Sequence, residues 1–258
     1  MKAESTVRSS AHSLTVGNKL GYGAGDFAFN LAYQTTMFYL MYFFTDVFVI
    51  GAAAAGSIFL FSKLWDAVSD PLMGVICDHT RSRWGNKRPY LLFGAVPLAV
   101  TFFLLFASPA VPDNLKVLYG YASFIIFCTA ITVVNIPYGA LTASMTLDIN
   151  ERAGLSGFRM SFALIGTLFA AGATKALVGL FPNETAGFRT VSLIYAVVIV
   201  IVLLVTFLST REEVLPGQET TAVNFNRLTH ISRARLNQYS SAHGELDIGY
   251  ITSPCKRS

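Results

Sequence analysis

Long apolar runs separated by short polar segments fill the first four fifths of the chain. Six of these runs are long enough to cross about 30 Å of hydrocarbon, which takes about 20 helical residues. The runs cover residues 20–45, 52–76, 90–109, 115–141, 155–181 and 187–209. The pattern predicts an all-α polytopic membrane protein with six transmembrane helices.

The same pattern divides the chain into three regions. Residues 1–19 form a polar N-terminal segment, residues 20–209 the six-helix transmembrane bundle, and residues 210–258 a polar tail. The tail has no apolar run that could span a bilayer, and its scattered Ser, Thr, Asn and Arg are typical of disordered segments. We therefore expect a membrane domain followed by a disordered tail.

Composition supports a membrane protein and excludes two other classes. Hydrophobic residues make up 53% of the chain and charged residues 13%, whereas an ordinary soluble domain has about 25% charged residues. The net charge of +4 could suggest nucleic-acid binding, but the basic residues lie at the ends of the apolar runs and form no stripe on a folded domain. The expected partner is the lipid bilayer, and nucleic acid is not expected to bind.

Basic residues predict the orientation of the bundle. Fifteen of the 19 Lys and Arg residues fall on the side of the membrane that holds both termini, and only Lys116 and Arg189 fall on the other. Short loops rich in Lys and Arg stay in the cytoplasm. We expect a multi-pass protein of the cell (inner) membrane with both termini in the cytoplasm.

Three charged residues lie inside the second span, where each costs about 2.5 to 3.5 kcal/mol near the bilayer centre. Lys63, Asp66 and Asp70 are spaced i, i+3 and i+7 and therefore share one helix face. Two carboxylates one turn apart need a proton, a sodium ion or the Lys63 ammonium as a partner. The spacing indicates a cation site, with a Lys–Asp bridge that fixes helix register as the alternative.

Asp26 lies early in the first span, after Gly23-Ala24-Gly25. This run formally matches the Gly-x-Gly-Asp element of intramembrane aspartyl proteases. Those enzymes also need a Tyr-Asp partner in a preceding span, and here Asp26 already lies in the first one. We therefore do not expect an enzyme, and Asp26 is a candidate site residue or a polar residue near the cytoplasmic interface.

Further hydrogen-bonding side chains interrupt the apolar spans and suggest a polar path through the bundle. Each of them is individually more typical of contacts between membrane helices than of ligand binding. They are Asn30, Gln34, Thr132, Asn135 and Tyr138.

Several motifs together resemble the glycoside-pentoside-hexuronide:cation symporters of the major facilitator superfamily, and the glucuronide-carrier branch most closely. The most specific is Trp65-Asp66-Ala67-Val68-Ser69-Asp70-Pro71, followed by the basic loop at residues 78–89. Further matches lie at residues 42–46 and 135–141. The resemblance covers residues 19–213, so it implies the N-terminal six-helix bundle of that fold and leaves the tail unrelated to the family.

The resemblance also implies roles for individual residues. The coupling cation, sodium or proton, would bind at Asp66, Ser69, Asp70 and Thr132, with Asp66 and Asp70 as the metal ligands if it is sodium. The sugar would bind at Asn30, Asn135, Tyr138 and Arg159. No other cofactor is implied.

Three departures from the melibiose carriers of that family bear on the substrate. Asn30 and Asn135 stand where those carriers have sugar-binding aspartates, Gly139 replaces a tryptophan on which the sugar stacks, and Ser69 replaces an asparagine. Loss of two carboxylates would suit an anionic sugar such as a glucuronide, which Arg159 could pair. The sugar itself and the choice between sodium and proton stay open.

The loop after the second span resembles the cytoplasmic latch between the two bundles of that superfamily. Its alternative is an anchor that only fixes orientation through positive charge. The residues concerned are Asp78, Arg81, Arg83, Lys87 and Arg88.

The implied function is sugar:cation symport by alternating access, in which one six-helix bundle moves against another. With six predicted spans, the chain is expected to be a truncated half of such a transporter, with little or no transport alone. Two alternatives are a half-transporter that completes its cavity by self-association, and a membrane protein that binds ligand or partners without transport.

Overall fold

The structure, a computed structural model, describes residues 15–80, 82–146 and 148–210. The expectations for residues 1–14, for Arg81 and for the tail from residue 211 onward lie outside these described residues. The described elements are α1 (Val16–Tyr42), the π-helical turn η1 (Phe43–Val47), α2 (Ala52–His79), α3 (Arg88–Leu105), α4 (Asp113–Met145), α5 (Ile149–Val178) and α6 (Glu184–Ser209). The prediction of six long helices is confirmed.

Four of the described helices, α3 to α6, are long and apolar enough to cross a membrane by length and composition alone. The other two, α1 and α2, have 27 and 28 residues and are also long enough. Their composition is more polar because Asp26 interrupts α1, and Lys63, Asp66 and Asp70 interrupt α2. The two helices that depart from a simple apolar span therefore carry much of the predicted site.

Side-chain caps fix the starts of three helices by accepting backbone hydrogen bonds that the first helical turn leaves unmade. The Thr15 hydroxyl accepts from the backbone N–H of Asn18 at the start of α1. Asp148 and Asn183 cap α5 and α6 in the same way. The three helices begin at Val16, Ile149 and Glu184, three to six residues before the predicted apolar runs, because the first helical turns are polar.

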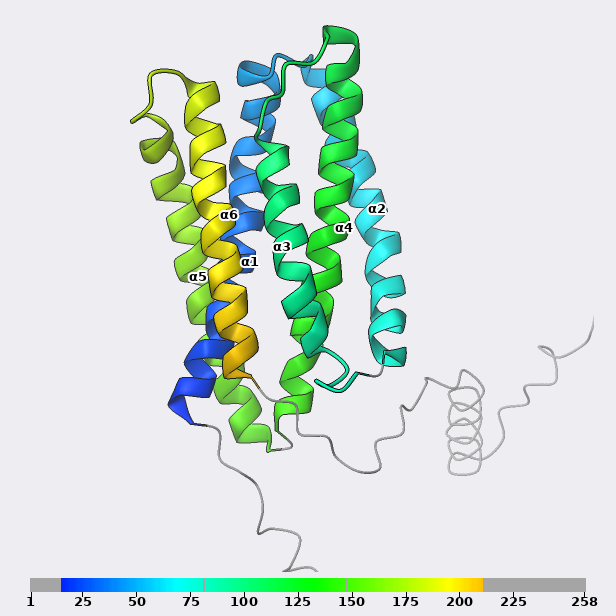
Figure 1. The fold of residues 1–258 in the computed structure, drawn as a ribbon, viewed down its shortest axis with the longest axis vertical. Coiled ribbons are helices and arrows are strands. Elements are labelled where there is room, and N and C mark those ends of the chain that lie inside the picture. The colour runs from blue at the N-terminus through cyan, green and yellow to red at the C-terminus, as the bar shows by residue number, and fades with distance from the viewer. Residues whose placement is uncertain (1–14, 81, 147, 211–258) are drawn as a thin grey trace, which may run out of the picture. The chain divides into compact units, whose positions relative to one another are not determined.

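The helices run alongside one another as a bundle (Figure 1). Helix α1 packs against α5 and α6, α3 packs against α4 and α6, and α2 packs mainly against α4. The start of α1 and the end of α6 lie at the same end of the bundle (Figure 1), and a Cβ on Gly21 would lie only 2.2 Å from the Cβ of Ser209. Both ends of the described chain are therefore on the same side of the bundle.

Aromatic side chains fill the core near the opposite end. The rings of Phe43 and Phe106 meet edge to face at 5.2 Å, and Phe188 of α6 lies 5.5 Å from Phe43. All three rings are buried. Such ring pairs contribute about 0.5 to 1.5 kcal/mol each beyond the area they bury, so this cluster holds η1 and the ends of α3 and α6 together.

Candidate functional site

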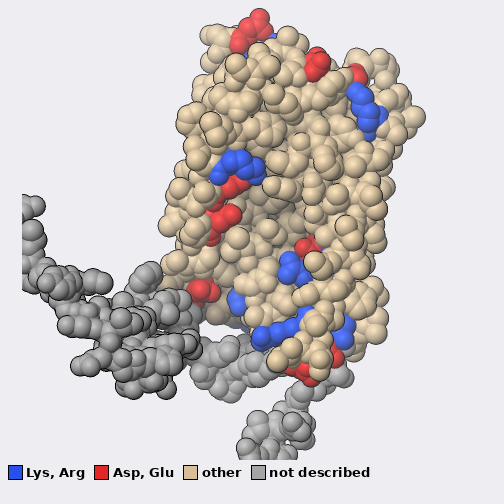
Figure 2. Space-filling model, turned by 180° about the vertical axis from the view of Figure 1, so that it is seen from behind, with Lys and Arg blue, Asp and Glu red and all other residues tan. Residues whose placement is uncertain are grey.

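A cavity of about 510 Å³ lies among α1, α2, α4 and α5 and contains most of the polar side chains predicted for the site. Figure 2 shows basic and acidic side chains lying together partway along a hollowed face, between the charged side chains at its two ends. The lining residues are Asp26, Phe29, Asn30, Tyr33, Lys63, Asp66, Asp70, Ile131, Thr132, Asn135, Ile136 and Arg159.

Helical periodicity explains why these residues meet. On α1, Asp26, Asn30 and Tyr33 are spaced i, i+4 and i+7, so they point to the same side. The acidic face of α2 has the matching spacing i, i+3 and i+7. Thr132 and Asn135 of α4 lie one turn apart between them. Three polar helix faces therefore converge on one cavity.

The α2 side of the cavity holds the two carboxylates predicted to bind the cation. The Lys63 ammonium donates to Asp66 Oδ2 at 3.0 Å, and the Thr132 hydroxyl donates to Asp70 Oδ1 at 2.8 Å. The second oxygen of Asp66, Oδ1, is buried without a hydrogen-bond partner, and the thiol of Cys128 lies beside this carboxylate. The two carboxylates therefore have different partners: Asp66 contacts the Lys63 ammonium, and Asp70 contacts a neutral hydroxyl.

The α5 side of the cavity holds an ion pair between Arg159 and Asp26. The guanidinium contacts both carboxylate oxygens, Nε to Oδ2 at 2.5 Å and Nη2 to Oδ1 at 3.3 Å. The Tyr138 hydroxyl donates to the same Oδ2 at 2.9 Å, and its ring centroid lies 4.9 Å from the guanidinium. Asp26 is thus a partner of Arg159 and belongs to the site.

The structure brings together six of the eight residues predicted for the cation and the sugar. Asp66, Asp70 and Thr132 line one side of the cavity, and Asn30, Asn135 and Arg159 line the other parts. Two do not line it. The Ser69 hydroxyl bonds to the Asp66 carbonyl of its own helix at 3.4 Å, and Tyr138 is fully buried behind Asp26.

Four further lining residues were not predicted from the sequence: Phe29, Tyr33, Ile131 and Ile136. The Tyr33 hydroxyl oxygen accepts a hydrogen bond from the Lys63 ammonium at 3.2 Å, and the Tyr33 ring centroid lies 5.0 Å from the same nitrogen. Phe29 gives the cavity an aromatic wall. Tyr33 could have been predicted, because its spacing from Asp26 and Asn30 places it on the same face of α1.

The residues predicted to form a latch reach different helices of this bundle. Lys87 donates to the Ser144 hydroxyl near the end of α4 at 2.5 Å, and Arg88 donates to the Phe207 carbonyl of α6 at 2.9 Å. The Arg83 guanidinium stacks on Trp84, and Asp78 is exposed near the end of α2. Lys87 and Arg88 therefore tie the loop to its own bundle, and a latch to a second bundle stays a prediction.

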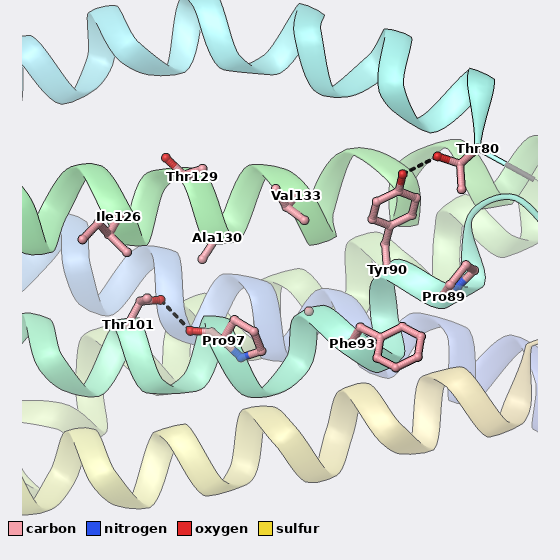
Figure 3. A pocket seen from close by; sticks show the side chains of 11 residues that line it. Thr80, Pro89, Tyr90, Phe93, Pro97, Thr101, Ile126, Thr129, Ala130 and Val133 are labelled. Atoms are coloured by element: carbon pink, nitrogen blue, oxygen red, sulfur yellow. Dashed lines mark hydrogen bonds between the residues drawn. The ribbon is translucent and has the colours of Figure 1, made fainter. Parts of the chain in front are cut away.

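A second cavity, of about 600 Å³, lies among α2, α3 and α4 and is almost entirely apolar (Figure 3). Its hydroxyl groups already have partners within the protein: Thr80 bonds to Tyr90 at 2.5 Å, and Thr101 donates to the Pro97 carbonyl at 2.9 Å. A sugar needs hydrogen-bonding groups that are available to it. The smaller polar cavity is therefore the candidate site.

The polar cavity can hold a monovalent cation through oxygen atoms. Within the described residues, no group of three His, Cys, Asp or Glu side chains is placed to hold a metal ion. Carboxylate and hydroxyl oxygens of Asp66, Asp70 and Thr132 nevertheless form a hard donor set, which suits a hard cation or a proton.

Comparison with known proteins shows similarity to sugar transporters and symporters. A family model described as MFS/sugar transport protein matches residues 21–236. The uncharacterized symporter YnaJ of Bacillus subtilis (strain 168) is 38% identical over 216 residues, which are 82% of this chain and 47% of that protein. The isoprimeverose transporter of Lactiplantibacillus pentosus is 34% identical over 209 residues, 80% of this chain and 44% of that protein.

A solved structure shows the same fold. The crystal structure of a D-xylose-proton symporter matches with a TM-score of 0.53 at 17% identity, covering 87% of this chain and 54% of that chain. The chain spans about half the length of the curated relatives it matches. These relatives are named as a symporter and a transporter, so the resemblance inferred from the motifs is confirmed. The six helices form the N-terminal-half-like bundle of a multi-pass membrane protein, and the chain belongs to the MFS/sugar transport protein family.

Proposed function

We propose that the polar cavity is the cation-coupling and sugar-binding wall of a sugar:cation symporter. The observation that carries this proposal is the convergence of three carboxylates, two hydroxyls, two amides, a lysine and an arginine in one cavity between otherwise apolar helices. Charged groups are costly at membrane depth unless they bind something or pair with one another. One ion pair on each side still leaves Asp70 with only a hydroxyl partner, which favours a cation as a cosubstrate.

The cation binds at Asp66 and Asp70, with the Thr132 hydroxyl as a further oxygen donor. Ser69 joins this set only if its hydroxyl rotates away from the carbonyl of its own helix. Either sodium or a proton would neutralise Asp70, since both suit a carboxylate oxygen. The relatives are named as symporters, which is consistent with an ion as the driving cosubstrate.

The sugar binds between α1, α4 and α5. Asn30 and Asn135 offer amide donors and acceptors to hydroxyl groups, and Phe29 and Tyr33 offer ring faces for the apolar side of a pyranose. Arg159 can contact the sugar while it stays paired with Asp26. Tyr138 acts from behind, because it positions Asp26 and is buried from the cavity.

The membrane orientation places both termini in the cytoplasm. The start of α1 and the end of α6 lie at one end of the bundle, as an even number of crossings requires (Figure 1). The basic residues Lys19, Arg83, Lys87 and Arg88 lie toward that end, which satisfies the positive-inside rule.

The six helices form one wall of the transport path, and a second wall of similar size would enclose the sugar. Alternating access then follows from rocking of one wall against the other. The isolated chain is expected to bind cation and sugar without moving the sugar across the membrane. Counter-flow of a radiolabelled sugar by the isolated chain, abolished by Asp70→Asn, would contradict this expectation.

A homodimer is the second candidate, because α2 exposes a row of apolar side chains beside the cavity. Leu64, Val68 and Leu72 are each 56 to 58% exposed along this row. A second copy could cover it and enclose the cavity. Crosslinking in native membranes should then yield a dimer, whereas a uniform monomer would exclude it.

The proposed function is tested by ligand binding to the purified chain in lipid nanodiscs. Isoprimeverose and a methyl glucuronide are titrated by calorimetry with sodium, with choline in its place, and at lowered pH. A coupling cation must raise sugar affinity, and the sugar must raise cation affinity by the same factor. Asp70→Asn should remove this coupling, and a sugar affinity indifferent to both cations would refute the proposal.

A further inference from the structure

We infer that Lys63 is a tethered cation that competes with the transported cation for Asp66. This inference rests on the proposed cation site and adds a regulatory residue to it. The Lys63 ammonium already contacts Asp66 Oδ2 at 3.0 Å, from one turn earlier on the same helix. A cation that binds both carboxylates therefore shares Asp66 with this ammonium, and repulsion between the two positive charges favours release of the ammonium.

The distribution of charge around the cavity supports the competition. Among the lining residues that the structure describes, Arg159 pairs with Asp26 and Lys63 pairs with Asp66. Asp70 accepts only a hydroxyl hydrogen bond, from Thr132. The cavity thus holds two internal ion pairs and one carboxylate without a cationic partner, so an incoming monovalent cation meets Asp70 first.

The Lys63–Asp66 pair has the properties of a displaceable contact. The Lys63 side chain is 42% exposed and that of Asp66 is 21% exposed, and a partly solvated lysine pair is weak because a flexible stem must be ordered to form it. The other carboxylate oxygen, Asp66 Oδ1, is buried without a hydrogen-bond partner. A bound cation can satisfy this oxygen, which the ammonium at Oδ2 does not do.

Tyr33 is an alternative partner for the displaced Lys63 ammonium. Its hydroxyl lies 3.2 Å from Lys63 Nζ, and its ring centroid lies 5.0 Å from the same nitrogen. An aromatic face attracts an ammonium group when the carboxylate is taken by another cation. Lys63 can therefore leave Asp66 and keep its existing partner on α1.

The test measures sodium binding to the purified chain in nanodiscs through the fluorescence of Trp65. This residue precedes Asp66, and its indole N–H donates to Thr129 at 2.9 Å, so its emission reports the state of the site. Trp84→Phe removes the other tryptophan of the chain. In the Trp84→Phe background, sodium replaces choline at constant ionic strength. The sodium concentration at the midpoint of the Trp65 fluorescence change is compared among variants.

Lys63→Gln should tighten sodium binding by about tenfold or more, because an opposite charge next to a carboxylate changes its cation affinity by about one to three logarithmic units. Lys116→Gln is the matched control, since Lys116 forms the same i, i+3 contact with Asp113 at the start of α4, away from the cavity. Its midpoint should equal that of the parent. Unchanged or weaker binding in Lys63→Gln would overturn the competition.

A proton is tested by titrating the same variants with pH in sodium-free buffer, where Lys63→Gln should raise the midpoint by about one unit or more. Asp70→Asn separates the two proposals. If Asp70→Asn abolishes the fluorescence change caused by sodium or acid, the cation site is supported whatever Lys63→Gln does. If Asp70→Asn retains this change, the cation site itself is refuted.

Chemical labelling of the unaltered chain keeps the test independent of any folding defect in the variants. The rate of reductive methylation of Lys63 is measured by mass spectrometry and divided by the rate for Lys116. This ratio should rise in saturating sodium if sodium is the cation, or at lowered pH if the cation is a proton. A Lys63 labelling rate that neither cation changes would overturn the inference.

Discussion

The Arg159 guanidinium on α5 contacts both carboxylate oxygens of Asp26 on α1, at 2.5 and 3.3 Å. Tyr138 of α4 donates to the same carboxylate, so this one ion pair, with its hydrogen bond, joins three helices at the α5 side of the polar cavity. Arg159 therefore does not present an uncompensated charge to a ligand. An anionic sugar that pairs with Arg159 must compete with Asp26 for the guanidinium.

Asp26→Asn should reduce the stability of the bundle and change its ligand preference. Removal of one partner from a buried ion pair costs about 3 to 5 kcal/mol, and partial exposure of this pair lowers the expected loss to about 2 kcal/mol. The released Arg159 should raise the affinity for a methyl glucuronide relative to isoprimeverose. Thermal unfolding in detergent and calorimetry measure the two effects.

The control for this variant is Asp113→Asn, which breaks the exposed pair with Lys116 at the start of α4. It should leave both the unfolding temperature and the ligand preference unchanged. A double variant, Asp26→Asn with Arg159→Gln, should recover part of the lost stability, because no unpaired guanidinium remains. An additive loss in the double variant would show that the two residues do not act as a pair.

Gly166→Ala should separate α1 from α5. A Cβ at position 166 would lie 2.8 Å from the Phe27 carbonyl oxygen and 3.2 Å from the Asn30 Cβ, and the backbone oxygen cannot move aside without moving α1. Overpacking of this kind costs about 1 to 3 kcal/mol. Gly172→Ala on the same helix meets nothing within 4 Å and should be neutral or stabilising in thermal unfolding. Equal effects of the two variants would contradict the close approach.

Periodicity within one helix was sufficient to predict part of the site. Lys63, Asp66 and Asp70 share a face of α2 because helical geometry alone fixes their relative directions. Six helix positions were likewise predictable, because the length of each apolar run is set by the thickness of the bilayer. These features depend on residues that are near in sequence.

Contacts between distant helices were not predictable in this way. Asp26 and Arg159 are 133 residues apart, and nothing in the spacing of either helix identifies the other as its neighbour. The sequence therefore left Asp26 without a partner and treated Arg159 as available to a substrate carboxylate. Tyr138 shows the same limit, since its burial behind Asp26 depends on the packing of α1 against α4.

Glu184→Gln should weaken the bundle slightly, and only above acidic pH. The Lys175 ammonium donates to Glu184 Oε1 at 2.7 Å, and this hydrogen bond lowers the pKa of the Glu184 carboxyl below its ordinary value. A lowered pKa stabilises the fold above the unfolded pKa, and this contribution is lost as pH falls through the folded pKa. For so exposed a pair the loss is below about 1 kcal/mol.

Thermal unfolding of the parent and Glu184→Gln as a function of pH tests this prediction. The two unfolding temperatures should differ near neutral pH and converge as the pH falls below the ordinary pKa of a glutamate, about 4.3. The Tyr42 hydroxyl also donates to Glu184, at 2.5 Å, and a glutamine can still accept from it. A difference that persists in acid would therefore point to packing and not to charge.

Thr132→Val should weaken sodium binding while Thr132→Ser preserves it. The Thr132 hydroxyl donates a hydrogen bond to Asp70 Oδ1 at 2.8 Å, and this bond orients the carboxylate in the cavity. A hydrogen bond to a charged group contributes about 1.5 to 3 kcal/mol, and the proposed site also uses the Thr132 oxygen as a donor to the cation. Valine, which has nearly the shape of threonine, should therefore reduce sodium affinity by about tenfold or more. Serine keeps the donor and removes only the methyl group. Calorimetric titration of both variants decides the point: a serine variant as weak as the valine variant would mean that the methyl packing of Thr132, and not its hydroxyl, supports the cation site.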